Sequence, residues 1–257
     1  MPGEASLTRS WTFPLHRFAA LGTLTQRDER EIAELGEEPV CHRRGEVIRH
    51  EGTRVEGFYL LIEGWVASSL DVGNDRRRIQ KLHLPGDILS TPSMVLETAA
   101  DTLTPLTDCV TSFVSHRALG RLLASNSRLT AMLVMAIQIE RLHLMDALAS
   151  AGQSSAIENM AHLLLDLHNR LQALHSVSEN SFHLPVTQET LGEVLGLSAI
   201  HVNRTLRAMV AQGLIAMRDR QVTLVDLPRL RSLSPVPLRT IVREPSWLPA
   251  ADEPGGG

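Results

Sequence analysis

Apolar side chains recur along the chain with two different spacings, and each spacing predicts a different kind of element. From residue 127 to 149 they return every three or four positions, which predicts a long helix. This helix carries two apolar stripes, one with Leu133, Ile137, Leu144 and Leu148, the other with Met132, Met135, Ile139, Leu142 and Met145. A surface helix needs only one such stripe, so burial on two sides is expected. Two readings fit: a central helix inside one large domain, or a helix that packs against its own domain and against a second copy.

The segment before this helix has the pattern of short strands. Beyond a helical stretch from Pro14 to Leu35, in which Thr25 is a candidate N-cap, glycines separate runs rich in β-branched and aromatic residues. The predicted strands are residues 46–50, 58–62, 65–70, 78–84 and 109–114, with Gly73-Asn74 at one hairpin tip. This regular spacing of strands and turns indicates a small antiparallel barrel or sandwich.

The pattern after the long helix returns to short helices. A polar break at Ala151–Ser155 is the expected hinge, followed by a helix from Ala156 to His175. Two further helices, Thr187–Leu195 and Ser198–Gln212, meet at Gly196, where glycine permits the positive φ of a helix end. Thr187 and Ser198 are suited to N-cap them. Residues 217–225 then have the pattern of a tight hairpin, so the whole predicts a winged helix-turn-helix.

The second of these helices separates its side chains by face. Val202, Leu206 and Met209 share one apolar face, while residues 199, 200, 203, 204 and 207 lie on others, as in a recognition helix for the major groove. Two helices joined by a glycine turn are common in α-rich domains, but the hairpin favours DNA binding. The stretch closely resembles the DNA-binding domain of the CRP/FNR family (cAMP receptor protein and fumarate-nitrate reductase regulator), without a gap from Thr187 through Arg204.

This resemblance implies roles for individual residues. Arg204 matches the arginine that reads a base edge, and His201 aligns with a threonine near a phosphate. Ile200 and Ala199 replace a glutamate and an arginine that read bases in family members, so the preferred half-site is expected to differ. The expected DNA-binding set is Gln188, Ser198, Ala199, Ile200, His201, Asn203, Arg204 and Arg207.

The N-terminal half resembles the cyclic-nucleotide-binding β-roll of the same family. The resemblance covers roughly residues 24–115 and rests on the glycine spacing in RRGEVIRHEG, FYLLIEGWV and LHLPGD. It implies an α+β fold and use of the long helix for homodimerisation, through Met135, Ile139, Leu142 and Met145. The expected organisation is a sensor at residues 14–125, a dimerisation helix at 126–150, a winged helix-turn-helix at 153–233 and a disordered tail at 234–257. Expected partners are double-stranded DNA, a second copy and RNA polymerase.

The cyclic-nucleotide site implied by the family is not expected to work here. Its Gly-Glu pair falls on Ser90-Thr91, and its phosphate-pairing arginine falls on Asp101. An iron–sulfur cluster needs four thiolates, whereas Cys41 and Cys109 are the two cysteines of the chain and are expected to be reduced. Haem stays open as an alternative, because it needs one or two axial ligands and His42, His50 and His83 lie in this half. No metal site is expected.

Composition changes this picture little. The net charge is −4, but residues 183–233 carry six arginines against four carboxylates, enough for a few phosphate contacts. No secretory signal or membrane span is expected, which favours a cytoplasmic protein. The chain lacks the short motifs of the common catalytic sites, so we do not expect an enzyme. The alternative function is a ligand-sensing adaptor whose winged helix binds protein rather than DNA.

Overall fold

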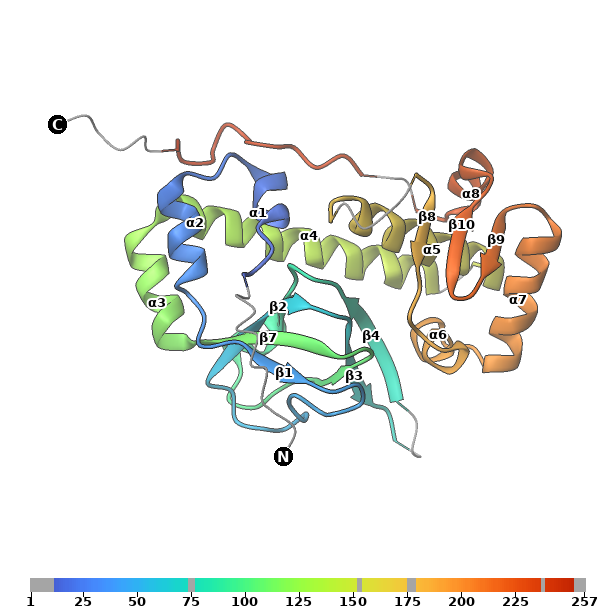
Figure 1. Ribbon diagram of the computed structural model, residues 1–257, viewed down its shortest axis with the longest axis horizontal. Helices are drawn as coiled ribbons and strands as arrows, with labels where there is room; N and C mark the ends of the chain where they lie inside the picture. Colours follow the sequence, from blue (N-terminus) through green and yellow to red (C-terminus); the bar gives the residue numbers. More distant parts are fainter. Residues whose placement is uncertain (1–11, 74–76, 152–153, 175–178, 237–238, 252–257) are drawn as a thin grey trace, which may run out of the picture.

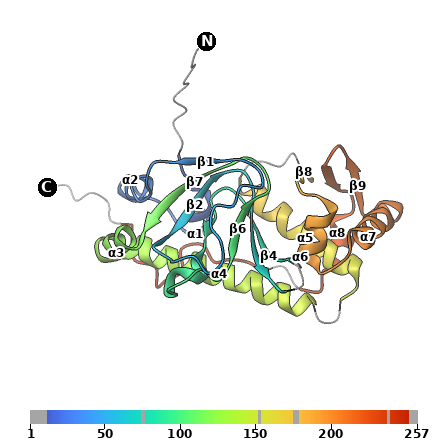
Figure 2. The same cartoon turned by 90° about the horizontal axis from the view of Figure 1, so that it is seen from below.

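The computed structural model describes residues 12–73, 77–151, 154–174, 179–236 and 239–251. A β-roll lies on one side of the long helix α4 (Ser127–Ala151), and a winged-helix unit lies at the far end of that helix (Figures 1 and 2). The predicted α+β fold is therefore confirmed. Parts of four expected segments lie outside the described residues: Asn74 of the hairpin tip, residues 152–153 of the hinge, His175 at the end of the following helix, and residues 237–238 and 252–257 of the tail.

Two antiparallel sheets form the β-roll. One has the order β1-β7-β2-β5 and contains Val40–His42, Cys109–Ser115, Gly57–Glu63 and Ile88–Leu89. The other has the order β4-β3-β6 and contains Arg77–His83, Val66–Asp71 and Thr102–Pro105. A short 3₁₀ helix, η1 (Thr91–Val95), follows β5. The strand expected at residues 46–50 is wrong: between Gly45 and Gly52, both with positive φ, the chain makes a single bridge from Arg49 to Leu103.

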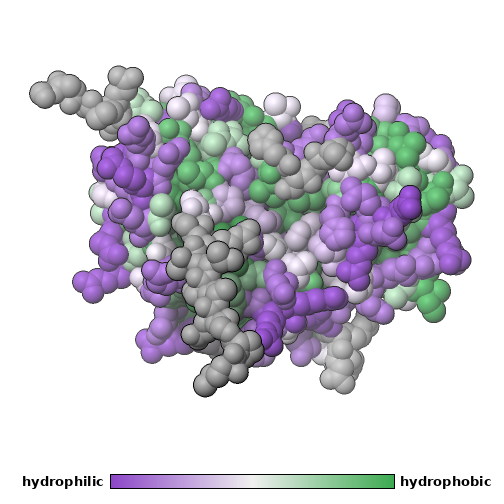
Figure 3. Space-filling view, in the orientation of Figure 1, coloured by the Kyte–Doolittle hydropathy of each residue, from purple (hydrophilic) through white to green (hydrophobic). Residues whose placement is uncertain are grey.

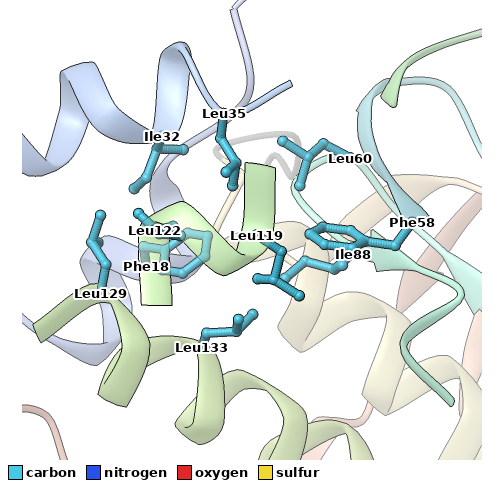
Figure 4. A pocket seen from close by; sticks show the side chains of 10 residues that line it. All are labelled: Phe18, Ile32, Leu35, Phe58, Leu60, Ile88, Leu119, Leu122, Leu129 and Leu133. Carbon is cyan, nitrogen blue, oxygen red and sulfur yellow. The ribbon is translucent and has the colours of Figure 1, made fainter. Parts of the chain in front are cut away.

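Helices close one end of the β-roll. The helical stretch expected from Pro14 to Leu35 is divided into α1 (His16–Leu21) and α2 (Gln26–Ala33), and Thr25 caps α2 in a capping box with Asp28. With α3 (His116–Ser125) and the start of α4 they cover strands β2 and β5. Ten side chains meet here around a cavity of about 10 Å³ (Figure 4): Phe18, Ile32, Leu35, Phe58, Leu60, Ile88, Leu119, Leu122, Leu129 and Leu133. A cavity of this size holds about one water molecule, so these ten side chains leave no room for a larger ligand.

The winged-helix unit begins with α5 (Ala156–Gln172), which Ser155 caps. It continues through β8 (Ser181–His183), α6 (Gln188–Leu195), α7 (Ala199–Ala211), β9 (Ile215–Arg218), β10 (Gln221–Leu224) and α8 (Leu227–Leu233). Its core is continuous with one face of the β-roll, since Ile79, Leu82 and Leu84 pack in the same apolar cluster as Leu164 and Leu191. The two units therefore share buried surface within one chain.

Residues 239–251, here called the C-terminal strap, return along α4 to the N-terminal helices (Figure 1). Arg239 binds Asp146 of α4 through two contacts of 2.6 and 3.0 Å. The Glu244 amide donates to the Leu21 carbonyl at 2.8 Å, and the Glu244 carboxylate accepts from the Thr23 amide and from Arg128. Leu248 packs against the apolar core of the β-roll. These contacts show that the expectation of a disordered tail from residue 234 is wrong for the strap. The proline-rich composition of this segment does not indicate such contacts.

Candidate nucleic-acid interface

The helix-turn-helix forms by the local signals that its sequence carries. The Thr187 hydroxyl accepts from the Thr190 amide at 3.1 Å, and the Ser198 hydroxyl accepts from the His201 amide at 3.2 Å. Gly196, between the two helices, has φ of 69°, the left-handed conformation that glycine adopts without strain. The predicted caps and turn are confirmed.

Helix α7 buries one face and leaves the other open. Val202, Leu206 and Met209 are at most 5% exposed and pack into the core of the winged-helix unit. On the other side Arg204 and Arg207 are exposed, and Ile200 is 84% exposed. Burying an isoleucine side chain is worth about 1.5–3 kcal/mol. An isoleucine this exposed, on the same face of α7 as Arg204 and Arg207, favours a surface that is covered when a partner binds.

The other predicted residues lie at the same end of the helix pair. Ser198 and Ala199 begin α7, with the Ser198 hydroxyl used as the cap. Gln188, the first residue of α6, accepts a hydrogen bond at 3.1 Å from the side-chain amide of Asn203. His201 is half-buried. The surface over α6 and α7 is mainly hydrophilic in the view of Figure 3.

The wing is a tight hairpin beside α7. Strands β9 and β10 pair in register from Ile215–Leu224 to Arg218–Gln221, and β8 joins β10 as a third strand. Asp219 and Arg220 form the turn with φ of 49° and 63°, the two positive values of a type I′ turn. Arg218, at the tip, is fully open to solvent. The predicted hairpin is confirmed, two residues longer at its start.

A buried carboxylate ties the winged-helix unit to the β-roll. Asp87, in the turn before β5, accepts from Arg170 of α5 at 2.8 Å and lies 2.6 Å from Nε of Arg17 of α1. Burial would raise the pKa of Asp87, but Arg17, Lys81 and Arg170 outweigh it and hold that pKa well below its usual range. Arg170 also donates to the Leu82 carbonyl at 2.7 Å. These contacts set the position of α5, and hence of α6 and α7, relative to the β-roll.

An internal ion pair fills the segment that matches the cyclic-nucleotide cassette. Arg49 lies 2.6 Å from the Asp101 carboxylate, donates to the Ser90 hydroxyl and is 6% exposed. The residues next to Ser90-Thr91 in the sequence do not reveal this cation, because Arg49 is 41 positions before Ser90. The cation comes from the loop between β1 and β2, and it is paired with Asp101, the residue expected at the position of the family's arginine.

Two of the three candidate haem ligands, His42 and His83, lie in different sheets. The His42 ring is 3.0 Å from the Thr111 hydroxyl, whereas the His83 ring is buried 3.1 Å from the Ser68 hydroxyl in the other sheet. Within the described residues no three His, Cys, Asp or Glu side chains are grouped as a metal site requires. Cys41 is free and exposed, and Cys109 is free and buried.

The structure places the four predicted dimer residues on two sides of α4. Met135 is 8% exposed and packs in the core of the β-roll, and Ile139 and Leu142 are half-buried. Met145 is 53% exposed. It belongs to an open row at heptad spacing with Val134, Gln138, Arg141 and Leu148.

Two family models match the chain in these same regions. A cyclic nucleotide-binding domain matches residues 39–126, and a Crp-like helix-turn-helix domain matches residues 158–233. None of the helices in the described ranges has the length and hydrophobicity that crossing a bilayer requires.

Relatives with similar sequences are transcriptional regulators. The transcriptional regulatory protein btr of Bordetella pertussis is 27% identical over 205 residues, which is 79% of this chain and 84% of that protein. The nitrogen fixation regulation protein FixK of Bradyrhizobium diazoefficiens is 27% identical over 217 residues, 84% of this chain and 90% of that protein. The solved structure of FixK2 from Bradyrhizobium japonicum shares the fold with a TM-score of 0.70 at 24% identity, over 78% of this chain and 98% of that one.

Proposed function

Since the chain belongs to the CRP/FNR family of transcriptional regulators and carries its helix-turn-helix DNA-binding domain, we propose that it binds an inverted-repeat promoter site as a homodimer without responding to cyclic nucleotides. The observation that carries this proposal is the open face of α7, where Ile200, Arg204 and Arg207 are exposed beside the Gln188–Asn203 pair. We also propose that the bound protein contacts RNA polymerase at the promoter. The division of the chain into sensor, dimerisation helix and winged helix, at the boundaries given above, is part of the same proposal.

On this face, some residues are proposed to recognise DNA bases and others to bind the phosphate backbone and so position the protein on the duplex. Arg204 and Asn203 lie where side chains reach base edges, and arginine and asparagine recognise guanine and adenine respectively. Ile200 offers apolar contact to a thymine methyl group in place of a carboxylate. Arg207, one turn further along α7, together with Gln188, Ser198, Ala199 and His201 near the helix ends, serves the phosphate backbone.

Pairing of two copies is supported by α4. Val134, Met145 and Leu148 leave apolar surface open along a heptad row that the β-roll and the strap do not cover. A parallel pair of such helices would bury this row in a seam. Met135, Ile139 and Leu142 would then support the seam from the intrachain side, with Met145 inside it. A two-fold dimer of this kind binds half-sites about 10 base pairs apart, centre to centre.

The absence of a cyclic-nucleotide response is supported by Arg49 and Asp101. The guanidinium of Arg49 already has an anionic partner, and a phosphate placed against Asp101 would meet a negative charge. Release of that pair would leave a buried carboxylate alone, which is strongly unfavourable. The signal that this regulator reads is therefore sought outside the cyclic nucleotides.

Selection of binding sites from a random duplex pool tests the proposal. The wild type should select an inverted repeat. Arg204→Ala should cost about 1–3 kcal/mol and relax the preference at one base pair of each half-site. Arg207→Ala should weaken all sequences alike. A wild-type protein that neither selects a sequence nor is retained on random duplex DNA at low salt would show that the winged helix serves protein contact instead.

A further inference from the structure

The β-roll meets the helix-turn-helix along strand β4. Figures 1 and 2 both show β4 beside α6, and Arg77 of β4 binds Glu193 of α6 with a closest distance of 2.8 Å. This partly exposed ion pair adds modestly to the packing of β4 against α6, and it neutralises one carboxylate of the winged-helix unit. The start of β4 therefore lies beside the helix pair that is proposed to face DNA.

The next residue of β4, Arg78, reaches the turn between α6 and α7. Its guanidinium lies so close to Gly196 that a β-carbon at this position would collide with it. Gly196 provides the left-handed turn, and the guanidinium of Arg78, from another part of the chain, lies beside it. Arg78 is exposed, so its charge faces solvent at the edge of the winged-helix unit.

The turn leads directly into the recognition helix. Ser198, two residues after Gly196, caps the N-terminus of α7, and Ile200 and Arg204 follow on its open face. The N-terminus of a recognition helix enters the major groove, and the residues around it lie against the phosphate backbone. An arginine held beside this turn is close to where the nearest phosphates would lie.

We propose that Arg78, a residue of the sensor β-roll, contacts a DNA phosphate alongside the helix-turn-helix. This inference rests on the proposed binding of DNA through α7 and adds a contact that the winged-helix unit alone does not contain. The contact is electrostatic and independent of sequence, because a guanidinium beside the turn meets the backbone rather than base edges. DNA would then bind only one relative position of sensor and winged helix with full affinity.

The salt dependence of DNA affinity tests Arg78 directly. Each phosphate neutralised contributes about 0.9 to the slope of log affinity against log salt concentration, so a dimer that loses two contacts should lose about 1.8. Arg78→Gln should show this decrease with unchanged site preference, and Arg78→Lys, which keeps the charge, should keep most of the slope. Arg117→Gln is the matched control, because Arg117 is an exposed arginine of α3 at the other end of the molecule (Figure 1).

The possible results separate this inference from the proposed function. A slope for Arg78→Gln equal to that of Arg117→Gln, in a protein that still selects an inverted repeat, would overturn the Arg78 contact alone. A wild type without specific binding would overturn the proposed function. Melting curves of all three variants should coincide with that of the wild type, since surface substitutions of this kind change stability by less than about 0.5 kcal/mol. A lowered melting temperature for Arg78→Gln with an unchanged slope would make Arg78 a packing residue and overturn the inference.

Discussion

The side-chain amide of Asn203 on the recognition helix α7 donates a hydrogen bond to Oε1 of Gln188 at the start of α6, across 3.1 Å. The two residues are 15 positions apart and belong to the two helices of the motif. This bond restrains Asn203 before DNA arrives, which lowers the entropy cost of using it as a reader. It also joins a residue expected near phosphate to one expected near a base.

Gln188→Ala should therefore weaken specific DNA binding by about 0.5–1.5 kcal/mol, the usual net value of one hydrogen bond. The measurement is the affinity for a selected site by fluorescence anisotropy. In an Asn203→Ala background the same substitution should have a smaller effect, because the bond is already absent. Equal effects in both backgrounds would mean that Gln188 acts on DNA independently of Asn203.

Ile200→Glu should change the base preference rather than abolish binding. The side chain of Ile200 is 84% exposed on α7, so a glutamate is accommodated without repacking. A carboxylate can accept from the amino group of cytosine, whereas isoleucine contacts a thymine methyl group. Site selection should shift toward a cytosine-bearing half-site. An unchanged consensus would place position 200 away from the bases.

Met145→Glu should disrupt the homodimer. Its side chain is 53% exposed in the single chain, and a two-fold seam would place two like charges opposite each other. A penalty of about 2.7 kcal/mol raises the dimer dissociation constant about 100-fold, measurable by sedimentation equilibrium. Leu123→Glu is the control, because Leu123 is 43% exposed on α3, away from the heptad row. DNA affinity should fall with dimerisation for Met145→Glu alone.

Cyclic AMP and cyclic GMP should leave the melting curve unchanged at millimolar concentration. A ligand at 100 times its dissociation constant would stabilise the protein by about 2.7 kcal/mol. Arg49→Met should destabilise the fold by about 3–5 kcal/mol, because it leaves the buried Asp101 without its cation. Adding Asp101→Asn should recover part of this loss. A thermal stabilisation by either nucleotide would mean that the pair opens to admit it.

Stability should decrease as the pH falls from 7.5 to 5.5. Burial lowers the pKa of His83 well below its ordinary value, and the positive charge of Lys81 is the second cause. Burial also lowers the pKa values of His42 and His143. Below a pH of about 6.5 the unfolded chain binds protons at these histidines that the folded chain does not, so the free energy of unfolding falls. Urea unfolding at several pH values measures this slope. His83→Gln should reduce it; an unchanged slope would assign the effect to other groups.

The helix-turn-helix could be predicted from sequence because its signals are local. Thr187, Gly196 and Ser198 act on backbone within a few residues, and the buried face of α7 follows helical periodicity. The strands were predicted less well. Val40 and Cys41 of β1 are exposed, so this strand has no alternating pattern, and its pairing to β7 comes from residues far along the chain.

The sensor interior could not be predicted for the same reason. Arg49 and Asp101 are 52 positions apart, and Asp87 is contacted by Arg17, which comes before it in the sequence, and by Arg170, 83 positions after it. Such pairs leave no spacing that a single sequence reveals. On α4, the exposed residues Val134, Gln138 and Arg141 each lie one position before a residue of the predicted dimer stripe, Met135, Ile139 and Leu142. Helical periodicity alone does not show which side of the helix the β-roll covers.

Because of the C-terminal strap, the N-terminal unit is synthesised first but completes its folding last. The hydrogen bond from the Thr23 amide to Glu244 closes a loop of 221 residues, so the N-terminal unit obtains its last contacts only after the whole winged helix has left the ribosome. Contacts of such long range slow folding, because the chain between them must be organised first. A premature stop or a degradation tag near residue 240 would thus damage the part of the protein that was made first.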